Sequence, residues 1–203
     1  MDLSGFSRFV DPEGRCSDPR MINAVAAYCG VALAGRDDIA QARALCARLI
    51  SENVVSEATL RMVQDITGAS VFVARENGVV TGMTAFFLVR PEGMRALDEG
   101  RFDTLHPDPE LICRPRETPA GGYAWGFVGS TDKGAGRAVK ASIAVRETLF
   151  WAMPGYTRAA TDDGARLIFG TLGFKPVPGD PQLARYDGRD APLIGLDTKA
   201  AAA

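Results

Sequence analysis

The sequence predicts a single mixed α/β domain, helical in its N-terminal third (1–68), with a sheet core at about 70–190. At 203 residues, the chain is long enough for one well-buried core and short for two. Apolar residues recur at helical spacing before residue 68, Asn77-Gly78 separates two β-rich runs, and an alternating run at 121–130 precedes another helical pattern. We therefore expect a mixed, twisted sheet with helices on both faces.

Three helices are predicted in the first part of the chain. Residues 19–33 have few helix breakers, and residues 37–52 place apolar side chains at helical spacing behind an acidic start. In the third segment, Ser56 is suited to cap the helix start and Gly68 to end it.

Strands are expected at about 71–75 and 79–89, because Asn-Gly between two β-rich runs is a strong signal for a tight hairpin. Residues 90–121 are rich in proline and in charges of both signs, which favours a partly helical insertion. In the strand at 121–130, alternation places Tyr123, Trp125 and Phe127 on one side.

The residue pattern in the remainder of the chain predicts a second set of helices and strands. A weakly polar face at helical period predicts a helix from Arg137 to about Ala152 that packs on the sheet. We expect a short strand at 156–161, a helix at 162–174, and extended segments near 174–179 and 183–188.

Composition narrows the functional classes. The formal net charge is −2 and the charges are interspersed, so no nucleic-acid surface is expected. No stretch approaches the roughly 18 apolar residues of a membrane span, and the first 15 residues carry acids and turn formers where a leader would be apolar. The four cysteines are scattered, which is typical of reduced, structural thiols. These features favour a cytoplasmic protein.

The sequence lacks residues that several common types of active site require. His106 is the only histidine, so a histidine-based metal site or a Ser-His-Asp triad is not expected. The segment GSTDKGAG lacks the Lys-Ser/Thr pair of a nucleotide-binding P-loop, and no GxSxG motif marks a hydrolase serine.

Gly134 and Gly136 form a G-x-G pattern between a predicted strand and a predicted helix. Glycines permit close backbone approach, and a helix start offers free N–H groups to a phosphate. Lys133 and Arg137 could add positive charge. The alternative interpretation is a simple strand-to-helix turn.

Three motifs follow one another within about residues 70–175: the hairpin VFVARENGVVTGMTAFFLV, the strand and loop YAWGFVGSTDKGAG, and the segment TDDGARLIFGTLGF. In this order they resemble the GNAT family of acyl-CoA-dependent N-acyltransferases. The resemblance implies a sheet that splays near its fourth strand, acetyl-CoA or another acyl-CoA as co-substrate without a metal, and a small-molecule or peptide amine as acceptor. A homodimer is also compatible with it. The implied cofactor-binding residues are Phe127, Val128, Thr131, Lys133, Gly134, Ala135, Gly136, Arg137, Asp162 and Phe169.

This sequence departs from the family pattern at three positions. Thr131 replaces the usual Gln or Arg of the loop, Asp162 replaces an Asn, and Phe169 replaces the tyrosine that protonates the departing thiolate in many members. Candidate bases are Tyr123, His106 and Glu110, which lie on or before the fourth strand. Two alternatives stay open: a catalytically silent protein of this fold that binds CoA or a partner, and a structural α/β domain without a cofactor.

Overall fold

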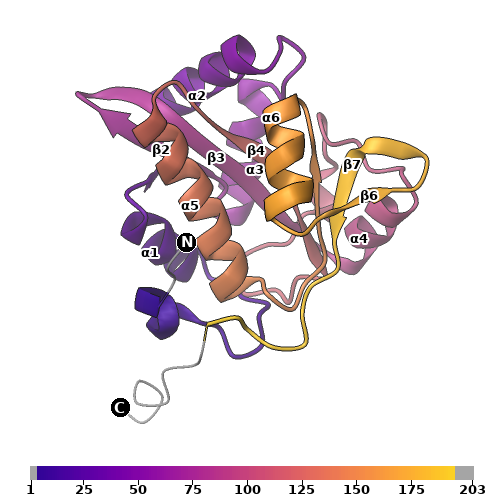
Figure 1. The fold of residues 1–203 in the computed structure, drawn as a ribbon. Coiled ribbons are helices and arrows are strands. Elements are labelled where there is room, and N and C mark those ends of the chain that lie inside the picture. The colour runs from indigo at the N-terminus through magenta and orange to yellow at the C-terminus, as the bar shows by residue number, and fades with distance from the viewer. Residues whose placement is uncertain (1–3, 195–203) are drawn as a thin grey trace.

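The computed structural model describes residues 4–194 and has one mixed sheet with helices on both faces (Figure 1). Within these residues the sheet has seven strands in the order β1-β2-β3-β4-β5-β7-β6, and only β4 and β5 run parallel. The predicted fold class is therefore confirmed. The strands are β1 (Ala32–Leu33), β2 (Val71–Glu76), β3 (Val79–Val89), β4 (Gly121–Gly129), β5 (Gly155–Arg158), β6 (Lys175–Val177) and β7 (Asp180–Tyr186).

The N-terminal part is helical, as predicted, except near residue 30. The helices are η1 (Ser4–Phe9), α1 (Pro19–Tyr28), α2 (Arg36–Leu49) and α3 (Glu57–Thr67). The Ser56 hydroxyl accepts the Thr59 N–H at 3.0 Å and Gly68 ends α3 at a φ of 71°. The prediction of a helix through residue 33 was wrong, because Gly30 turns the chain at a φ of 81° and Ala32–Leu33 pairs with β2 as a short edge strand.

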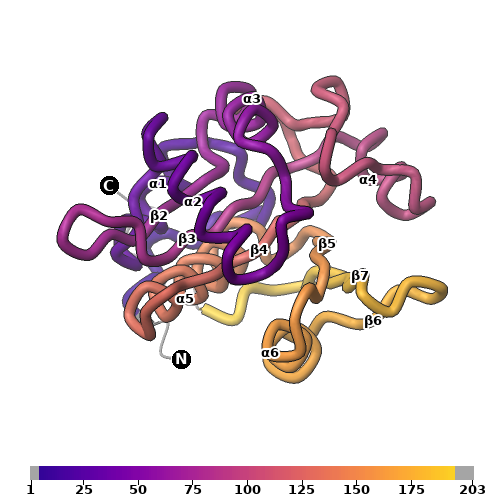
Figure 2. Tube along the Cα trace, turned by 90° about the horizontal axis from the view of Figure 1, so that it is seen from above, coloured from indigo at the N-terminus to yellow at the C-terminus, as the bar shows by residue number. Residues whose placement is uncertain are grey.

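The hairpin between β2 and β3 is confirmed, and it fixes which helices cover which face. Asn77 and Gly78 both have positive φ, as a two-residue hairpin turn requires. Phe72 on β2 packs in the cluster with α1 and α5, whereas Val73 packs with α2 and α3. In Figure 2, α3 and α4 accordingly lie on one side of the sheet, and α5 and α6 lie on the other.

Residues 90–121 contain α4 (Pro91–Asp98) and the short η2 (Pro109–Leu111), so the expected partly helical connection is observed. Parts of it are core: Met94, Leu97 and Ile112 are buried with Tyr123 of β4. The loop between α4 and η2 reaches β4, where the Trp125 indole N–H donates to the Thr104 carbonyl at 2.7 Å.

Strand β4 contains an irregularity that the sequence did not predict. Ala85 pairs with Gly126 but Phe86 pairs with Ala124, so Trp125 is an extra residue in a β-bulge. The bulge breaks the alternation: Tyr123 and Trp125 pack on the α4 side, whereas Phe127 lines a pocket on the α5 side. The prediction that all three share one side was therefore wrong.

The helix after β4 begins earlier than predicted. Helix α5 spans Asp132–Leu149, because Thr131 caps it by accepting the Gly134 N–H at 2.9 Å. Gly134 and Gly136 therefore lie within its first turns. The last helical segment is α6 (Asp162–Ala165), which continues as a π-helical segment over Arg166–Thr171. None of the helices in residues 4–194 is both long and apolar enough to span a membrane.

Candidate functional site

Two pockets lie on opposite faces of the sheet beside the end of the β4–β5 pairing. The last paired residues are Ala124 and Thr157, and β4 continues beyond them to Gly129. One pocket lies against α5 and has a cavity of about 80 Å³. The other lies against α2 and has a cavity of about 150 Å³. We call them the α5-side pocket and the α2-side pocket.

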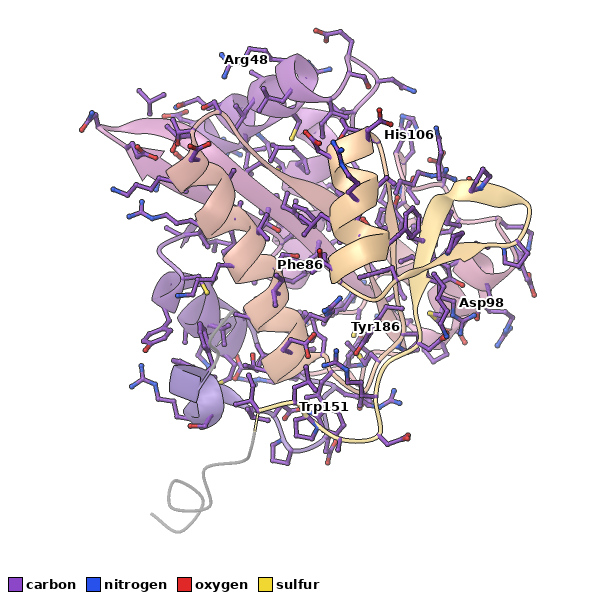
Figure 3. All side chains as sticks on the ribbon, viewed as in Figure 1. Arg48, Phe86, Asp98, His106, Trp151 and Tyr186 are labelled. Atoms are coloured by element: carbon purple, nitrogen blue, oxygen red, sulfur yellow. The ribbon has the colours of Figure 1, made fainter. Side chains whose placement is uncertain are left out.

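The α5-side pocket is apolar and has a floor of backbone. Gly122 and Gly155 face each other across β4 and β5, and a Cβ built on Gly155 would meet only the Gly122 carbonyl, at 3.8 Å. A side chain at position 155 would therefore extend into the hollow. Aromatic and aliphatic side chains form the walls; they include Phe86, Phe127, Ile143, Phe150, Leu172, Phe174 and Tyr186 (Figure 3 labels Phe86 and Tyr186).

The one charged residue that lines the α5-side pocket in the described chain, Arg146, is hydrogen-bonded within the fold. Its guanidinium donates to the buried Glu147 carboxylate at 2.9 and 2.6 Å and to the Leu172 carbonyl at 2.9 Å. Glu147 is 2% exposed and also pairs with Arg189. All three guanidinium nitrogens of Arg146 thus have protein acceptors, although Glu147 is shared by two arginines.

The α2-side pocket combines apolar walls with two partly exposed arginines. Its floor comes from Met83, Trp125 and Val128, and α2 and the α2–α3 loop form one wall. Thr104 and Leu105 of the 90–121 connection form another wall. Two of the lining residues carry charge, Arg43 and Arg158, and none of the described lining residues is acidic.

Strand β4 lies between the two pockets. Ala124 and Phe127 line the α5-side pocket, Trp125 and Val128 line the α2-side pocket, and Tyr123 lines both. From Trp125 onward, β5 no longer pairs with β4, so that edge of β4 presents backbone donors and acceptors beside both pockets. Burial raises the pKa of Tyr123, so its hydroxyl stays protonated at neutral pH and is a donor rather than a base.

The predicted pyrophosphate loop is the first turn of α5, and its two glycines differ. A Cβ on Gly134 would lie 2.3 Å from the Thr81 carbonyl oxygen, so this glycine lets α5 pack closely on β3. A Cβ on Gly136 would meet no atom within 4 Å. The first-turn N–H groups of Asp132 and Lys133 have no acceptor within the helix, so they can bind another group.

A carboxylate lies beside this helix start, which the sequence did not indicate. Glu76, at the end of β2, accepts hydrogen bonds from the hydroxyls of Thr131 at 2.9 Å and Thr81 at 3.1 Å. The Thr131 hydrogen bond is the main cause that lowers the pKa of Glu76, and Lys133 and Arg137 lower it further. The two cations therefore offset Glu76 and Asp132.

The other predicted site residues are spread around these pockets. His106 and Glu110 have exposed side chains, at 75% and 73%, and line neither pocket. Asp162 is exposed in the first turn of α6, and Phe169 is half-buried and outside both linings. Ala135 is half-buried in the first turn of α5. Sequence reasoning missed Arg43 and Arg158, which lie far apart in the chain and share no motif.

Comparison with known proteins gives similarity in fold without similarity in sequence. A structure of histone acetyltransferase HPA2 and related acetyltransferase from Corynebacterium glutamicum aligns with 20% identity and a TM-score of 0.43, over 81% of this chain and 98% of that chain. The Bacillus subtilis N-acetyltransferase YlbP in complex with coenzyme A aligns with 14% identity and a TM-score of 0.43, over 78% and 98%. A ribosomal-protein-alanine N-acetyltransferase from Brucella melitensis aligns with 14% identity and a TM-score of 0.44, over 77% and 98%.

In fold, this chain is similar to acetyltransferases. No family profile matches its sequence, and neither does any curated protein. At these identities and scores the alignments assign no activity to the chain. The GNAT-like fold predicted from the sequence agrees with the observed mixed sheet, whose fourth and fifth strands pair in parallel and then part.

Proposed function

We propose that this protein is an acyl-CoA-dependent N-acyltransferase that transfers an acyl group, most simply acetyl, to an amine. The observation that carries the proposal is the free edge of β4 between two pockets on opposite faces of the sheet. A transferase that joins two substrates directly needs such a meeting point, since the donor and acceptor must reach the same atoms from different sides.

The α5-side pocket suits the donor. The pantetheine arm of an acyl-CoA is a flexible, largely apolar chain with amide groups, and the α5-side pocket offers apolar walls beside the backbone edge of β4. The pyrophosphate would bind the first turn of α5, near Lys133, Gly136 and Arg137. Gly136 leaves open space there. Thr131 is already engaged with Gly134 and Glu76, so it has less capacity to bind phosphate.

The chemistry follows from these positions. A neutral amine nitrogen attacks the thioester carbonyl, a C–N bond forms and the C–S bond breaks. Backbone N–H groups on the free edge of β4 would stabilise the carbonyl oxygen as charge develops on it. The amine loses a proton to water, and the departing thiolate gains one. The Tyr123 side chain packs on the α4 side and burial raises its pKa, so it is not suited to protonate a thiolate in the α5-side pocket, and we assign that proton to water.

The direct experiment measures acetyl-CoA binding and transfer in the same preparation. At about 100 times its dissociation constant, acetyl-CoA should stabilise the protein by about 2.7 kcal/mol in thermal unfolding. Thiol release in the presence of a panel of primary amines measures transfer. Stabilisation without transfer to any amine would favour the silent CoA-binding alternative.

A pocket-filling variant links this binding to the α5-side pocket. Gly155→Val places a branched side chain into open space, so we expect a folded protein that acetyl-CoA no longer stabilises. The matched control is Gly170→Val, where the new side chain also meets open space but lies outside both pockets. Undiminished acetyl-CoA binding by folded Gly155→Val would exclude this pocket as the donor site.

A further inference from the structure

The charged groups that line the α2-side pocket are of one sign. Arg43 enters from α2 and Arg158 from the end of β5, and no acidic residue is found among the described residues of the lining. Resting on the proposed function, we infer that the acceptor is an amine that also carries a carboxylate, which Arg43 and Arg158 bind.

Both arginines retain hydrogen-bond capacity. The Arg158 guanidinium donates to Asp180 at 2.7 Å, and the Arg43 guanidinium donates to the Glu52 carbonyl at 3.3 Å. A guanidinium has five N–H donors, so each of these contacts leaves donors for a ligand. The side chains are 34% and 44% exposed for Arg43 and Arg158, which keeps them accessible to a ligand.

Asp180 orients one of the two arginines. Its contact with Arg158 is the main cause that lowers the pKa of Asp180, which holds this carboxylate charged at neutral pH. The pair joins β5 to β7 at the edge of the pocket. Arg43 has a weaker restraint, since the Glu52 carboxylate lies 3.7 Å away and is 86% exposed. The Arg158 guanidinium is therefore the better positioned of the two to bind a carboxylate through two hydrogen bonds. Arg43 is less restrained and adds a second positive charge.

The remaining surface of the pocket defines the rest of the acceptor. Met83, Trp125 and Val128 form an apolar floor, and Leu60 and Ile50 extend it toward α2 and α3. With a cavity of about 150 Å³, the pocket can hold a small molecule with an apolar body. The acceptor class is thus an amino acid with an apolar side chain, or an equivalent amino-carboxylate, with its amine directed toward β4 and its carboxylate toward the arginines.

The same charges select against other amines. A diamine, polyamine or lysine-rich peptide would place a second ammonium group beside two guanidinium groups, whose partner carboxylates Asp180 and Glu52 lie outside the described lining. Like charges at short range disfavour such ligands, so specificity comes from repulsion as well as from attraction.

The test uses three pairs of amines that differ only in the carboxylate: L-phenylalanine and phenethylamine, L-leucine and isoamylamine, and L-methionine and 3-(methylthio)propylamine. Acyl transfer from acetyl-CoA is measured as kcat/KM. Binding of the corresponding acetylated products, such as N-acetyl-L-phenylalanine and N-phenethylacetamide, is measured by calorimetry without CoA. We expect at least a tenfold preference for the carboxylate member in at least one pair, in both measurements.

Arg158→Gln and Arg43→Gln should reduce that preference by about tenfold each, because each removes a charge-assisted hydrogen bond. The matched control is Arg48→Gln, an arginine that is also on α2 but exposed and outside the pocket (labelled in Figure 3). Arg48→Gln should retain the full preference.

The outcomes separate this inference from the proposed function. Carboxylate-selective product binding that depends on both arginines, without transfer, would support the carboxylate-binding site and overturn the acyltransferase. Efficient transfer to both members of every pair, unchanged by Arg43→Gln and Arg158→Gln, would overturn the inference and leave the acyltransferase standing. Failure of all three acetylated amino acids to bind, with no carboxylate preference in transfer, would also overturn the inference.

Discussion

The arginines on the two faces of the sheet differ in how fully their hydrogen-bond donors are used. On the α5 side, Arg146 donates to the buried Glu147 and to the Leu172 carbonyl, so all three of its guanidinium nitrogens already have protein acceptors. On the α2 side, Arg43 and Arg158 contact partly or fully exposed carboxylates and keep free donors. An apolar pocket whose arginine is already hydrogen-bonded suits a long flexible donor, whereas accessible guanidinium groups can select an acceptor by charge.

The largest effect should come from breaking the buried ion pair. Glu147→Gln leaves two arginines, Arg146 and Arg189, without their buried counter-charge, so we expect the free energy of unfolding to fall by about 3–5 kcal/mol. Chemical denaturation measures this loss. Glu52→Gln is the matched change on the α2 side, where the exposed pair with Arg43 should contribute at most about 1 kcal/mol. Equal losses in both variants would remove the contrast between the two faces.

The next effect distinguishes the two glycines of α5. Gly134→Ala places a methyl group 2.3 Å from the Thr81 carbonyl, so α5 must move away from β3, at a cost of about 3 kcal/mol. Gly136→Ala meets open space and should raise stability by up to about 1 kcal/mol through helix propensity. Thermal unfolding of both variants gives the comparison. If Gly134→Ala were as stable as the wild type, the close approach of α5 to the sheet would be disproved.

Local signals in the sequence were sufficient for much of the fold. Asn77-Gly78 specified the hairpin because both residues accept positive φ, and Ser56 and Gly68 specified the ends of α3. The start of α5 was misplaced because its glycines were taken as a turn, although Thr131 two residues before Lys133 is itself a helix cap. Glycine is tolerated in these turns, where Gly134 permits close packing on β3.

The candidate site was less accessible to sequence reasoning, since it depends on contacts between distant segments. The bulge at Trp125 arises from the pairing of β3 with β4, and nothing in the alternation of 121–130 marks it. Arg43 and Arg158 meet at one pocket only because α2 and the end of β5 lie beside β4. Gly122 and Gly155 were not singled out, because whether a missing side chain leaves a pocket depends on the residues around it in the fold. Whether the residues predicted for CoA bind it stays a prediction.

A smaller effect concerns the connection between β3 and β4, part of which lines the α2-side pocket. Thr104 and Leu105 line the α2-side pocket, whereas Met94, Leu97 and Ile112 belong to the core. Only the loop can therefore be altered without loss of the fold.

Replacing Thr104-Leu105 with Gly-Gly should raise the acceptor KM about tenfold, because apolar contact in the pocket is lost. Acetyl-CoA binding should be unchanged, since Thr104 and Leu105 line the α2-side pocket and not the α5-side pocket. His106→Ala, an exposed neighbour outside both pockets, serves as the control. A loss of acetyl-CoA binding in the Gly-Gly variant would contradict the assignment of the two faces.

The smallest effect tests how the same connection is anchored at its other end. Glu117 accepts from the Arg90 guanidinium at 2.9 and 2.7 Å and from the Arg114 N–H at 2.8 Å. The contact with Arg90 is the main cause that lowers the pKa of Glu117 to about 2, from an ordinary value of 4.5. Because the folded-state pKa is the lower one, the stabilisation is complete above about pH 4.5 and is lost as the pH falls toward 2.

We therefore expect wild type to melt slightly above Glu117→Gln at pH 7, and the two melting curves to converge between pH 4.5 and 2. Glu110→Gln is the control, because Glu110 is 73% exposed and lies 3.6 Å from Arg90, so its melting temperature should follow that of wild type at every pH. A constant gap between wild type and Glu117→Gln from pH 7 to pH 2 would mean that the difference is not due to the charge of Glu117. The connection would then be anchored by its buried residues, Leu97 and Ile112, and the α2-side wall would be independent of this ion pair.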